Sequence, residues 1–497
     1  MASKEPMYMY VHSAAPWLDD HIKSYIRDHV PDAVSVEDFE DLPVDAQSVF
    51  QFCDGWALTR NFAVLNRAES ALLNAYPNSD ALARKDHLAT IVEFWSSKRP
   101  NTALKGHVPL TVRLTLDYSE YVEESLMEAD NLELLHSLEK NATMPGPERE
   151  WWILKPALVD CGAGIRIFST VEELAGHLEL IEYEYDDDDE DDEESGESDG
   201  NAELNGTRAG EVNGPYLTWP EADRVNLDLL VTATGTMSLG KSDGETIGKR
   251  PKRPQYVFKE NGRIPSAQMR SFVAQRYIAA VSTLEGRKWH VRAYVLCIGR
   301  LKVYVFREML ALLSGEQYQP PWENPSLKSS LTNTALQDPE DFIKKESMRD
   351  FWAAPDDLLP GDWKNRIFDQ VCELSAEIVA AATHTMADKF TPINTCFELF
   401  AADFLIDTDG SAWLLEVNET PAFYEVGFAR GLSLRLMESV ICIAMEHMGK
   451  AREEDSRSAA VKERLVKVLD ETETLAKSNI TEIISEQDVG LRPILPA

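Results

Sequence analysis

Three side chains of the kind that bind metal ions lie in the segment 401–421, which reads AADFLIDTDGSAWLLEVNETP. An Asp-Gly pair between two apolar runs is a strong signal for a short β-hairpin. With that pair as the two turn residues, Asp403 lies directly opposite Glu416, and Asn418 shares their face. Two carboxylates ~5 Å apart repel unless a proton or a cation lies between them. With the amide oxygen of Asn418 they form a hard-oxygen set that suits Mg²⁺ bound to nucleotide phosphates.

The other face of the predicted hairpin is apolar. With Asp409 and Gly410 as the turn, that face carries Phe404, Ile406, Trp413, Leu415 and Val417. We expect these side chains to pack into a core. From spacing alone, the alternative to a metal site is an exposed acidic pair that a lysine or arginine neutralises.

Lys155 and a pair of glycines are suited to phosphate binding. Lys155 comes near the end of a predicted buried strand at 150–158 and precedes the sequence CGAG. Gly162 and Gly164 in that sequence allow backbone N–H groups to approach phosphates closely. A Gly-x-Gly of this kind is more often an ordinary turn, so it carries weight only together with the other residues.

A row of basic side chains follows one face of the segment RKWHVR at 287–292. Lys288, His290 and Arg292 share that face because side chains alternate along a strand. Such a row is often solvated, but this one lies in the same half of the chain as the acidic hairpin. The pattern G-x-S-x-G occurs at 196–200 and 240–244, but these matches lie in the acidic insert and in a Gly-rich loop, not at the strand-to-helix turn that a nucleophile elbow requires. Lysine, arginine and a carboxylate–amide metal site suit phosphoryl chemistry through positioning and charge neutralisation.

Length and charge set broad limits on the function. A chain of 497 residues exceeds one hydrophobic core and predicts two to four domains or subdomains. Its net charge is −36, of which residues 182–199 supply 13 acids and no base, so the remainder carries −36 + 13 = −23. Such an acidic protein is a poor general binder of nucleic acid or anionic membranes, and we expect neither as a partner.

The sequence predicts a cytoplasmic monomer. No apolar run approaches the ~18 residues of a membrane span, and the N-terminus lacks a signal-peptide core. The six cysteines form no C-x-x-C pair and no metal-ligand spacing, which favours a reducing compartment.

The elements that must position these residues alternate between strands and helices, which predicts an α/β fold. We expect strands at 7–13, 150–158, 163–170, 271–279, 288–299 and 301–314. We expect helices at 16–30, in two stretches of 70–95 broken near Pro77, at 368–386 and at about 458–477. The acidic, low-complexity insert at 182–215 cannot bury enough apolar surface to order itself.

Six ordered segments resemble the tubulin–tyrosine ligase family, a branch of the ATP-grasp enzymes. They read WWILKPALVDCGAGIRIF, VAQRYI, GRKWHVRAYVL, VYVFREML, SLTNTA and FELFAADFLIDTDGSAWLLEVNETP. The resemblance covers about residues 50–450. It implies ATP between two α/β subdomains, Mg²⁺ on its phosphates, and an acceptor carboxylate that becomes an acyl phosphate before an amino acid's amine attacks it.

The resemblance also implies a division of the chain and roles for its residues. We expect an N-terminal α/β subdomain at 1–82, a central ATP-grasp subdomain at 83–255 containing the insert, a C-terminal ATP-grasp subdomain at 256–450, and a helical or flexible tail at 451–497. The residues expected to bind ATP are Lys85, Lys155, Gly162, Gly164, Gln275, Arg276, Tyr277, Ile278 and Asn333. The residues expected to act in catalysis are Lys288, Arg292, Arg307 and Glu416. The expected magnesium ligands are Asp403, Glu416 and Asn418.

Two departures from the family pattern concern substrate placement. His290 stands where animal tyrosine ligases usually have Asp, and a histidine does not repeat the hydrogen bonding of a carboxylate. Cys161 stands where Arg or Lys is common, which removes one phosphate contact. The chain therefore resembles a fungal or protist-type subgroup.

Three classes of function remain open. The first is an ATP-dependent ligase that adds tyrosine, or another free amino acid, to a protein C-terminus such as the α-tubulin tail. The second is a tubulin glutamate ligase (polyglutamylase), which the tail at 451–497 disfavours because it holds 7 bases and 10 acids instead of a basic extension. The third is a nucleotide-binding cytoplasmic scaffold without turnover. The intact set of Asp403, Glu416 and Asn418 favours catalysis.

Overall fold

The computed structural model describes residues 6–13, 15–53, 62, 65–116, 119–157, 164–179, 270–324, 326–332, 337, 346–450 and 456–472. The sequence predictions for Cys161, Gly162, Asn333 and the insert at 182–215 therefore lie outside the described residues. None of the helices in these ranges is both long and apolar enough to cross a membrane.

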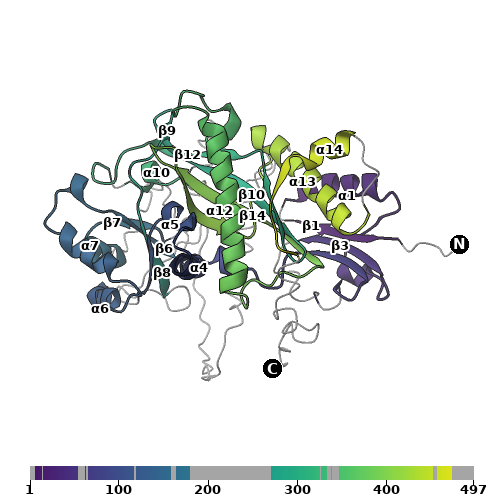
Figure 1. Cartoon of the computed structure of the whole chain (residues 1–497), viewed down its shortest axis with the longest axis horizontal. Coiled ribbons are helices and arrows are strands. Elements are labelled where there is room, and N and C mark those ends of the chain that lie inside the picture. Colours follow the sequence, from purple (N-terminus) through teal and green to yellow (C-terminus); the bar gives the residue numbers. More distant parts are fainter. Residues whose placement is uncertain are drawn as a thin grey trace, which may run out of the picture.

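Two β-sheets form the described part of the chain (Figure 1). The strands of the large sheet are β1 (Tyr8–His12), β2 (Val34–Val36), β3 (Ser48–Cys53), β4 (Ser70–Asn74), β9 (Thr283–Leu284), β10 (Arg287–Ile298), β11 (Lys302–Phe306), β12 (Leu310–Gln317), β13 (Met348–Asp350), β14 (Cys396–Ile406), β15 (Ala412–Asn418) and β16 (Leu465–Asp470). The strands of the small sheet, in spatial order, are β5 (Thr111–Thr115), β8 (Ser271–Arg276), β6 (Trp152–Pro156) and β7 (Arg166–Phe168).

Helices cover the sheets and connect the strands. The α-helices are α1 (Pro16–His29), α3 (Asp80–Ala83), α4 (Lys85–Lys98), α5 (Leu104–His107), α6 (Val122–Met127), α7 (Glu133–Asn141), α8 (Val171–Glu179), α10 (Leu327–Ser330), α12 (Trp363–Thr385), α13 (Gly427–His447) and α14 (Ser456–Lys462). Short 3₁₀ turns are η1 (Phe39–Asp41), η2 (Ser119–Tyr121), η3 (Gly146–Glu148) and η5 (Phe351–Ala353). The predicted α/β fold is thus confirmed.

The large sheet joins a parallel half to an antiparallel half. Strands β2, β1, β3 and β4 are parallel, and α1 makes the crossover from β1 to β2. Strand β4 then pairs in parallel with β14, next to which β10, β12 and β13 continue the sheet with antiparallel pairings. The N-terminal strands are therefore a continuation of the sheet that carries the candidate site.

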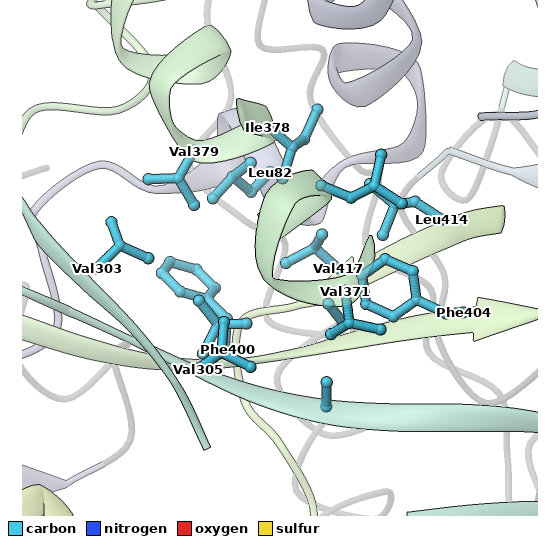
Figure 2. Close-up of a cluster of buried hydrophobic side chains, with 14 of the residues drawn as sticks. Leu82, Val303, Val305, Val371, Ile378, Val379, Phe400, Phe404, Leu414 and Val417 are labelled. Carbon is cyan, nitrogen blue, oxygen red and sulfur yellow. The ribbon is translucent and has the colours of Figure 1, made fainter. Parts of the chain in front are cut away.

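Each face of the large sheet has its own hydrophobic core. On one face, α12 packs over Val303, Val305, Phe400 and Phe404 (Figure 2). On the other face, α1 and α13 pack over alternate residues of β10 and β14, including Tyr294 and Leu399. Side chains alternate along a strand, so the row from Lys288 to Arg292 lies on the face of Tyr294 and not under α12.

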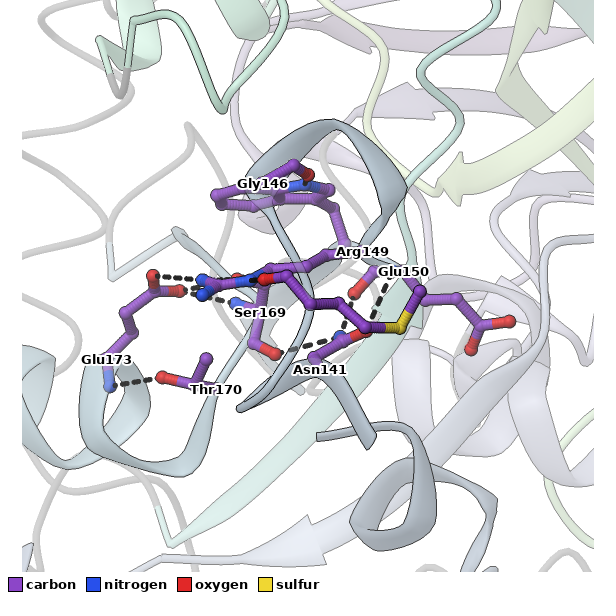
Figure 3. Close-up of polar contacts among 9 residues, drawn as sticks. Asn141, Gly146, Arg149, Glu150, Ser169, Thr170 and Glu173 are labelled. Atoms are coloured by element: carbon purple, nitrogen blue, oxygen red, sulfur yellow. Dashed lines mark hydrogen bonds and ion pairs between the residues drawn. The ribbon is translucent and has the colours of Figure 1, made fainter. Parts of the chain in front are cut away.

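A polar network fixes the frame of the small sheet (Figure 3). Asn141 of α7 donates hydrogen bonds to the carbonyl oxygens of Glu150 (2.7 Å) and Ser169 (2.9 Å). Thr170 directly precedes α8, and its hydroxyl accepts from the Glu173 N–H at 3.2 Å, while the Glu173 carboxylate accepts from the Ser169 N–H at 2.6 Å. These bonds tie α7 and α8 to the ends of β6 and β7, and thereby hold the strand that carries Lys155.

Two predicted helical segments are strands. Residues 70–74, predicted as helix, form β4 because Leu72 and Leu73 are fully buried between β3 and β14, where a strand pairs on both edges. Residues 465–470 form β16 on β11, and the preceding helix ends at Lys462. Tertiary pairing overrides local helix propensity in both places.

A buried carboxyl in β14 gives a test of this packing. Glu398 is 2% exposed and accepts hydrogen bonds from Ser79 Oγ (3.0 Å) and the Tyr76 N–H (3.3 Å). Burial raises its pKa well above the usual range, and the nearby Glu419 adds to the effect. A raised folded-state pKa means stability that is complete below the unfolded pKa and lost as pH rises toward the folded one.

We therefore expect Glu398→Gln to gain stability over the parent as pH increases from 5 to 8, by at most ~1.4 kcal/mol per pH unit. Denaturant unfolding at several pH values measures the difference. The matched control, Glu316→Gln on the exposed end of β12, should track the parent at every pH. A constant difference between Glu398→Gln and the parent would contradict the raised pKa.

Candidate active site

The metal-type residues of the hairpin meet as predicted, although part of the register differs. Asp403 pairs with Glu416 across β14 and β15, which confirms the predicted pair. Beyond this point the ladder shifts by one residue: Phe404 pairs with Leu414, and Leu415 is the extra residue of a β-bulge.

The bulge compensates for a turn of three residues instead of two. Residues 408–410 form the turn, and Gly410 has the positive φ of 81° that such a turn requires. The Asp407 carboxylate accepts hydrogen bonds from the backbone N–H groups of Asp409 (2.9 Å) and Ser411 (2.8 Å). The turn therefore offsets the ladder by one residue, and the bulge restores the register at Asp403.

The prediction of which residues form the apolar face is partly wrong, because the three-residue turn shifts the pairing by one residue. Trp413 and Leu415 were expected in the core, but Ala412 and Leu414 are buried there instead, with Phe404. A one-residue slip moves each side chain to the other face of the strand. Because the bulge ends the slip, the polar residues keep their common face: Asn418 Nδ2 lies 3.4 Å from Asp403 Oδ2.

Arg292 and Asp403 form a buried, bidentate ion pair. They are cross-strand partners on β10 and β14, and Arg292 Nε and Nη2 donate to the two carboxylate oxygens at 2.9 and 2.8 Å. Asp403 is 4% exposed, and the Arg292 charge holds its pKa below the usual range against the opposing effect of burial. His290 Nε2 lies 3.6 Å from Asp403 Oδ1, while its Nδ1 is 2.6 Å from Thr332 Oγ1.

Lys288 belongs to the same row and reaches the end of the small sheet. Its Nζ donates to the Tyr277 hydroxyl at 2.9 Å and lies 4.0 Å from the centre of that ring. Burial lowers the pKa of Lys288 to about 7. Burial also raises the pKa of Tyr277 to about 12, which keeps its hydroxyl protonated.

The small sheet supplies a second buried lysine. Lys155 Nζ on β6 donates to Gln275 Oε1 on β8 at 2.9 Å. The pKa of Lys155 is lowered to about 8: burial is the largest cause, Glu416 opposes it, and the charges of Lys85 and Lys288 add to it. The charges of Lys288 and Glu416 on the large sheet are thus close enough to Lys155 to influence its protonation.

Lys85 connects the two sheets. It is the first residue of α4, and its backbone N–H donates to Ala157 at the end of β6 at 3.2 Å. Its Nζ lies 3.7 Å from Glu416 Oε2 on the metal hairpin. The site therefore brings together four cationic side chains and two carboxylates, an excess of positive charge that suits a polyphosphate.

The donor set fits Mg²⁺ only together with phosphate oxygens. In the described part of the chain, no three His, Cys, Asp or Glu side chains are grouped to hold a metal ion. Two carboxylates and one amide are hard oxygen donors of the kind that leave the remaining Mg²⁺ positions to nucleotide and water. In the structure, Arg292 neutralises Asp403 and Lys85 neutralises Glu416. The sequence left open that Asp403 and Glu416 are an exposed acidic pair neutralised by basic side chains. They are indeed paired with Arg292 and Lys85, but neither carboxylate is fully exposed.

An apolar cluster lies beside the two buried lysines. Tyr277 packs with Trp151, Ile153, Ile165 and Ile167. Ile153 and Lys155 share one face of β6 because they are two residues apart. The cluster is suited to a planar base next to the phosphates that Lys155 would bind.

The structure does not bring every expected residue to this site. Arg276 faces the other side of the small sheet, where it pairs with Glu133 at 2.7 Å and lies over Trp152. Arg307 is exposed, and its guanidinium lies against the rings of Trp352 and Phe368, 4.9 Å from each ring centre.

Gly164 and Ile278 flank the buried lysines. Gly164 has φ of +71°, and a Cβ there would lie 2.8 Å from Pro156 Cγ, so the backbone requires glycine. Ile278 directly follows Tyr277 and is partly buried.

Tyr424, which sequence reasoning missed, belongs to the site: its hydroxyl oxygen lies 3.3 Å from Arg292 Nη1. It follows the hairpin in a loop without a regular spacing, so no pattern signalled it.

The chain has the ATP-grasp fold. The C-terminal domain of Pby1 from K. lactis, described as an ATP-grasp enzyme that interacts with the mRNA decapping enzyme Dcp2, superposes with a TM-score of 0.58. The match has 22% sequence identity and covers 94% of this chain and 99% of that domain. Enzymes of this fold use ATP, generally with Mg²⁺.

The chain belongs to the tubulin–tyrosine ligase family, whose sequence pattern it matches over residues 64–199 and 241–445. It is 33% identical to a probable tubulin–tyrosine ligase of Schizosaccharomyces pombe, over 73% of this chain and 74% of that protein. It is 29% identical to the probable tubulin–tyrosine ligase PBY1 of Saccharomyces cerevisiae, over 71% of this chain but 40% of that longer protein. The resemblance stated from the sequence is thus confirmed.

Replacing Lys155 should weaken ATP binding far more than stability. A charge-assisted hydrogen bond of this kind contributes ~1.5–3 kcal/mol, so we expect Lys155→Ala to lose roughly ten- to hundred-fold in ATP affinity. Isothermal titration calorimetry measures the change, with Lys140→Ala on exposed α7 as the control. Equal affinities for the variant and the parent would remove Lys155 from the nucleotide site.

The lowered lysine pKa values predict that ATP affinity falls as pH rises. Phosphate binds the ammonium forms, whereas Lys288 and Lys155 lose their protons near pH 7 and 8. Each lysine should therefore weaken binding ~tenfold per pH unit above its pKa. Titrations between pH 7.5 and 9 should show this slope, and it should be smaller in Lys155→Ala. A flat profile would contradict the role of both lysines.

Proposed function

We propose that this chain is an ATP-dependent ligase that joins a free amino acid to a protein carboxylate, with tyrosine and the C-terminus of α-tubulin as the substrates. The observation that carries the proposal is the meeting of Lys85, Lys155, Lys288 and Arg292 with the pair Asp403–Glu416 between two sheets. This arrangement suits phosphoryl transfer, which requires positioning and charge neutralisation more than a protein nucleophile.

The reaction proceeds in two steps that balance without a further reactant. An acceptor carboxylate oxygen attacks the γ-phosphorus of ATP, the bond to the β-phosphate oxygen breaks, and ADP leaves. The neutral amine of the amino acid then attacks the acyl carbon of the acyl phosphate, and phosphate leaves with the bonding pair. The amine's proton goes to solvent or phosphate, and the product is an amide.

Residues of the chain have separate tasks in these steps. Lys155 and Lys85 lie where the small sheet and α4 meet the hairpin, and we assign them to the phosphates. Lys288 and Arg292 lie along β10 and are assigned to the transferred phosphoryl group and the acceptor carboxylate. Asp403, Glu416 and Asn418 would hold Mg²⁺, which supplies charge neutralisation on the phosphates when bound.

The choice of tyrosine over glutamate rests on similarity to relatives. The chain is 33% identical to a probable tubulin–tyrosine ligase over 74% of that protein, whereas its match to a tubulin polyglutamylase covers 26% of that protein.

Incorporation of labelled amino acids into purified tubulin tests the proposal. We expect ATP-dependent incorporation of tyrosine, with glutamate at least tenfold slower, and loss of incorporation when the acceptor tail is removed. Preferential use of glutamate would establish the polyglutamylase alternative. ATP binding without incorporation of any of the twenty amino acids into tubulin would favour the scaffold alternative.

Glu416→Gln should abolish ligation and leave the fold intact. The substitution removes one of two charges assigned to Mg²⁺. In the part of the chain that the structure describes, Glu416 pairs with Lys85 at 3.7 Å, and partly exposed ion pairs contribute ~0–1 kcal/mol to stability. We therefore expect turnover to fall at least a hundredfold while the melting temperature stays within a few degrees. Glu316→Gln is the control, and wild-type turnover in Glu416→Gln would place the hairpin outside the active site.

A further inference from the structure

Arg292 uses all three of its guanidinium nitrogens in the structure. Nε and Nη2 donate to Asp403 Oδ1 and Oδ2, and Nη1 lies 3.3 Å from the Tyr424 hydroxyl. The contact between Arg292 and Asp403 is almost closed to solvent, because the side chains are 14% and 5% exposed. The guanidinium therefore occupies both oxygens of a carboxylate that is assigned to the metal.

A divalent cation and this guanidinium compete for Asp403. Both carboxylate oxygens accept from Arg292, and their remaining lone pairs face Asn418 Nδ2, 3.4 Å from Oδ2, and His290 Nε2, 3.6 Å from Oδ1. A cation that binds either oxygen therefore competes with donors that already surround Asp403. Two cations next to one buried carboxylate also repel each other strongly, since the site is screened from water. Metal binding at Asp403 thus loosens the hold on Arg292.

A released Arg292 is suited to a second carboxylate. A guanidinium is a planar fork that binds carboxylates in a bidentate manner, as it already does with Asp403. On the other side of Arg292, its cross-strand neighbour is Leu310 of β12, a fully buried residue whose apolar side chain cannot accept a hydrogen bond. The remaining contact to Tyr424 keeps the guanidinium near the hairpin.

We propose that Arg292 is exchanged between Asp403 and the carboxylate of the acceptor, so that the metal at Asp403 and the acceptor at Arg292 increase each other's affinity. The inference rests on the proposed ligase function for the identity of the acceptor as a carboxylate. Thermodynamic linkage makes the effect reciprocal: whatever factor the acceptor applies to metal affinity, the metal applies to acceptor affinity.

Binding measurements on the full chain test the exchange without turnover. Mn²⁺ replaces Mg²⁺ as the probe, since free Mn²⁺ is measured directly by electron paramagnetic resonance, and a non-hydrolysable ATP analogue is present throughout. The acceptor probe is N-acetyl-triglutamate, with N-acetyl-trialanine amide as its uncharged control. We expect the acidic peptide to tighten Mn²⁺ binding by at least ~fivefold, the lower end of typical coupling factors, and the control peptide to leave it unchanged.

Two variants separate the exchange from general electrostatic attraction. Arg292→Met should bind Mn²⁺ more tightly than the parent without peptide and should lose the peptide's effect. Arg435→Met removes another bidentate arginine pair, with Glu308 at 2.9 Å, and should keep the coupling. If Arg292→Met does not fold, Tyr424→Phe loosens only one contact of Arg292 and should tighten Mn²⁺ binding while keeping the coupling.

The measurements separate the proposed exchange of Arg292 from the proposed ligase function. An Mn²⁺ affinity that is independent of the acidic peptide in the parent, or a full peptide effect in Arg292→Met, overturns the exchange. Ligation of an amino acid together with an uncoupled Mn²⁺ site overturns the exchange and leaves the ligase function standing. Coupled binding without ligation of any amino acid overturns the ligase function and supports the exchange.

Discussion

The antiparallel pairing of β10 with β14 is the constraint on which the candidate site depends. It runs without a break from His290–Leu405 to Ile298–Phe397 and places Arg292 opposite Asp403. The same two strands separate the cores: one face packs under α12, and the other packs against α1 and α13. Because both cores hold these strands, a buried ion pair can be kept at their centre despite the cost of desolvating two charges.

The small sheet gives the site its second side. Lys155 is buried on β6, and its ammonium has one hydrogen bond, to Gln275, among the described residues. Desolvation of two lysines that approach one another is unfavourable, and the lowered pKa values of Lys155 and Lys288 record that cost. A polyphosphate between the sheets removes the cost, which is a physical reason for a site of this composition to bind ATP.

The sequence predicted those parts of the site that depend on local periodicity. The row from Lys288 to Arg292 and the pair Asp403–Glu416 follow from the alternation of side chains along strands. The facing of Trp413 and Leu415 was wrong because a three-residue turn and a compensating bulge cannot be read from an Asp-Gly pair. The strand at 70–74 escaped prediction because it is fixed by pairing on both edges, with β3 and with β14, and β14 lies far away in the sequence. Arg307 was expected in the site from resemblance, and its contact with the rings of Trp352 and Phe368 depends on packing that no short motif encodes.

The parallel contact between β4 and β14 has a consequence for how the chain is made. Leu73 pairs with Cys396, so the edge of the N-terminal strands stays open until the ribosome has synthesised most of the protein. The three central residues of β4, Ala71 to Leu73, are apolar and buried, and an unpaired strand edge can pair with other chains. The edge of β4 in the nascent chain thus stays unpaired while more than three hundred further residues are translated. Fragments that end before β14 would therefore lack the strand that pairs with this edge.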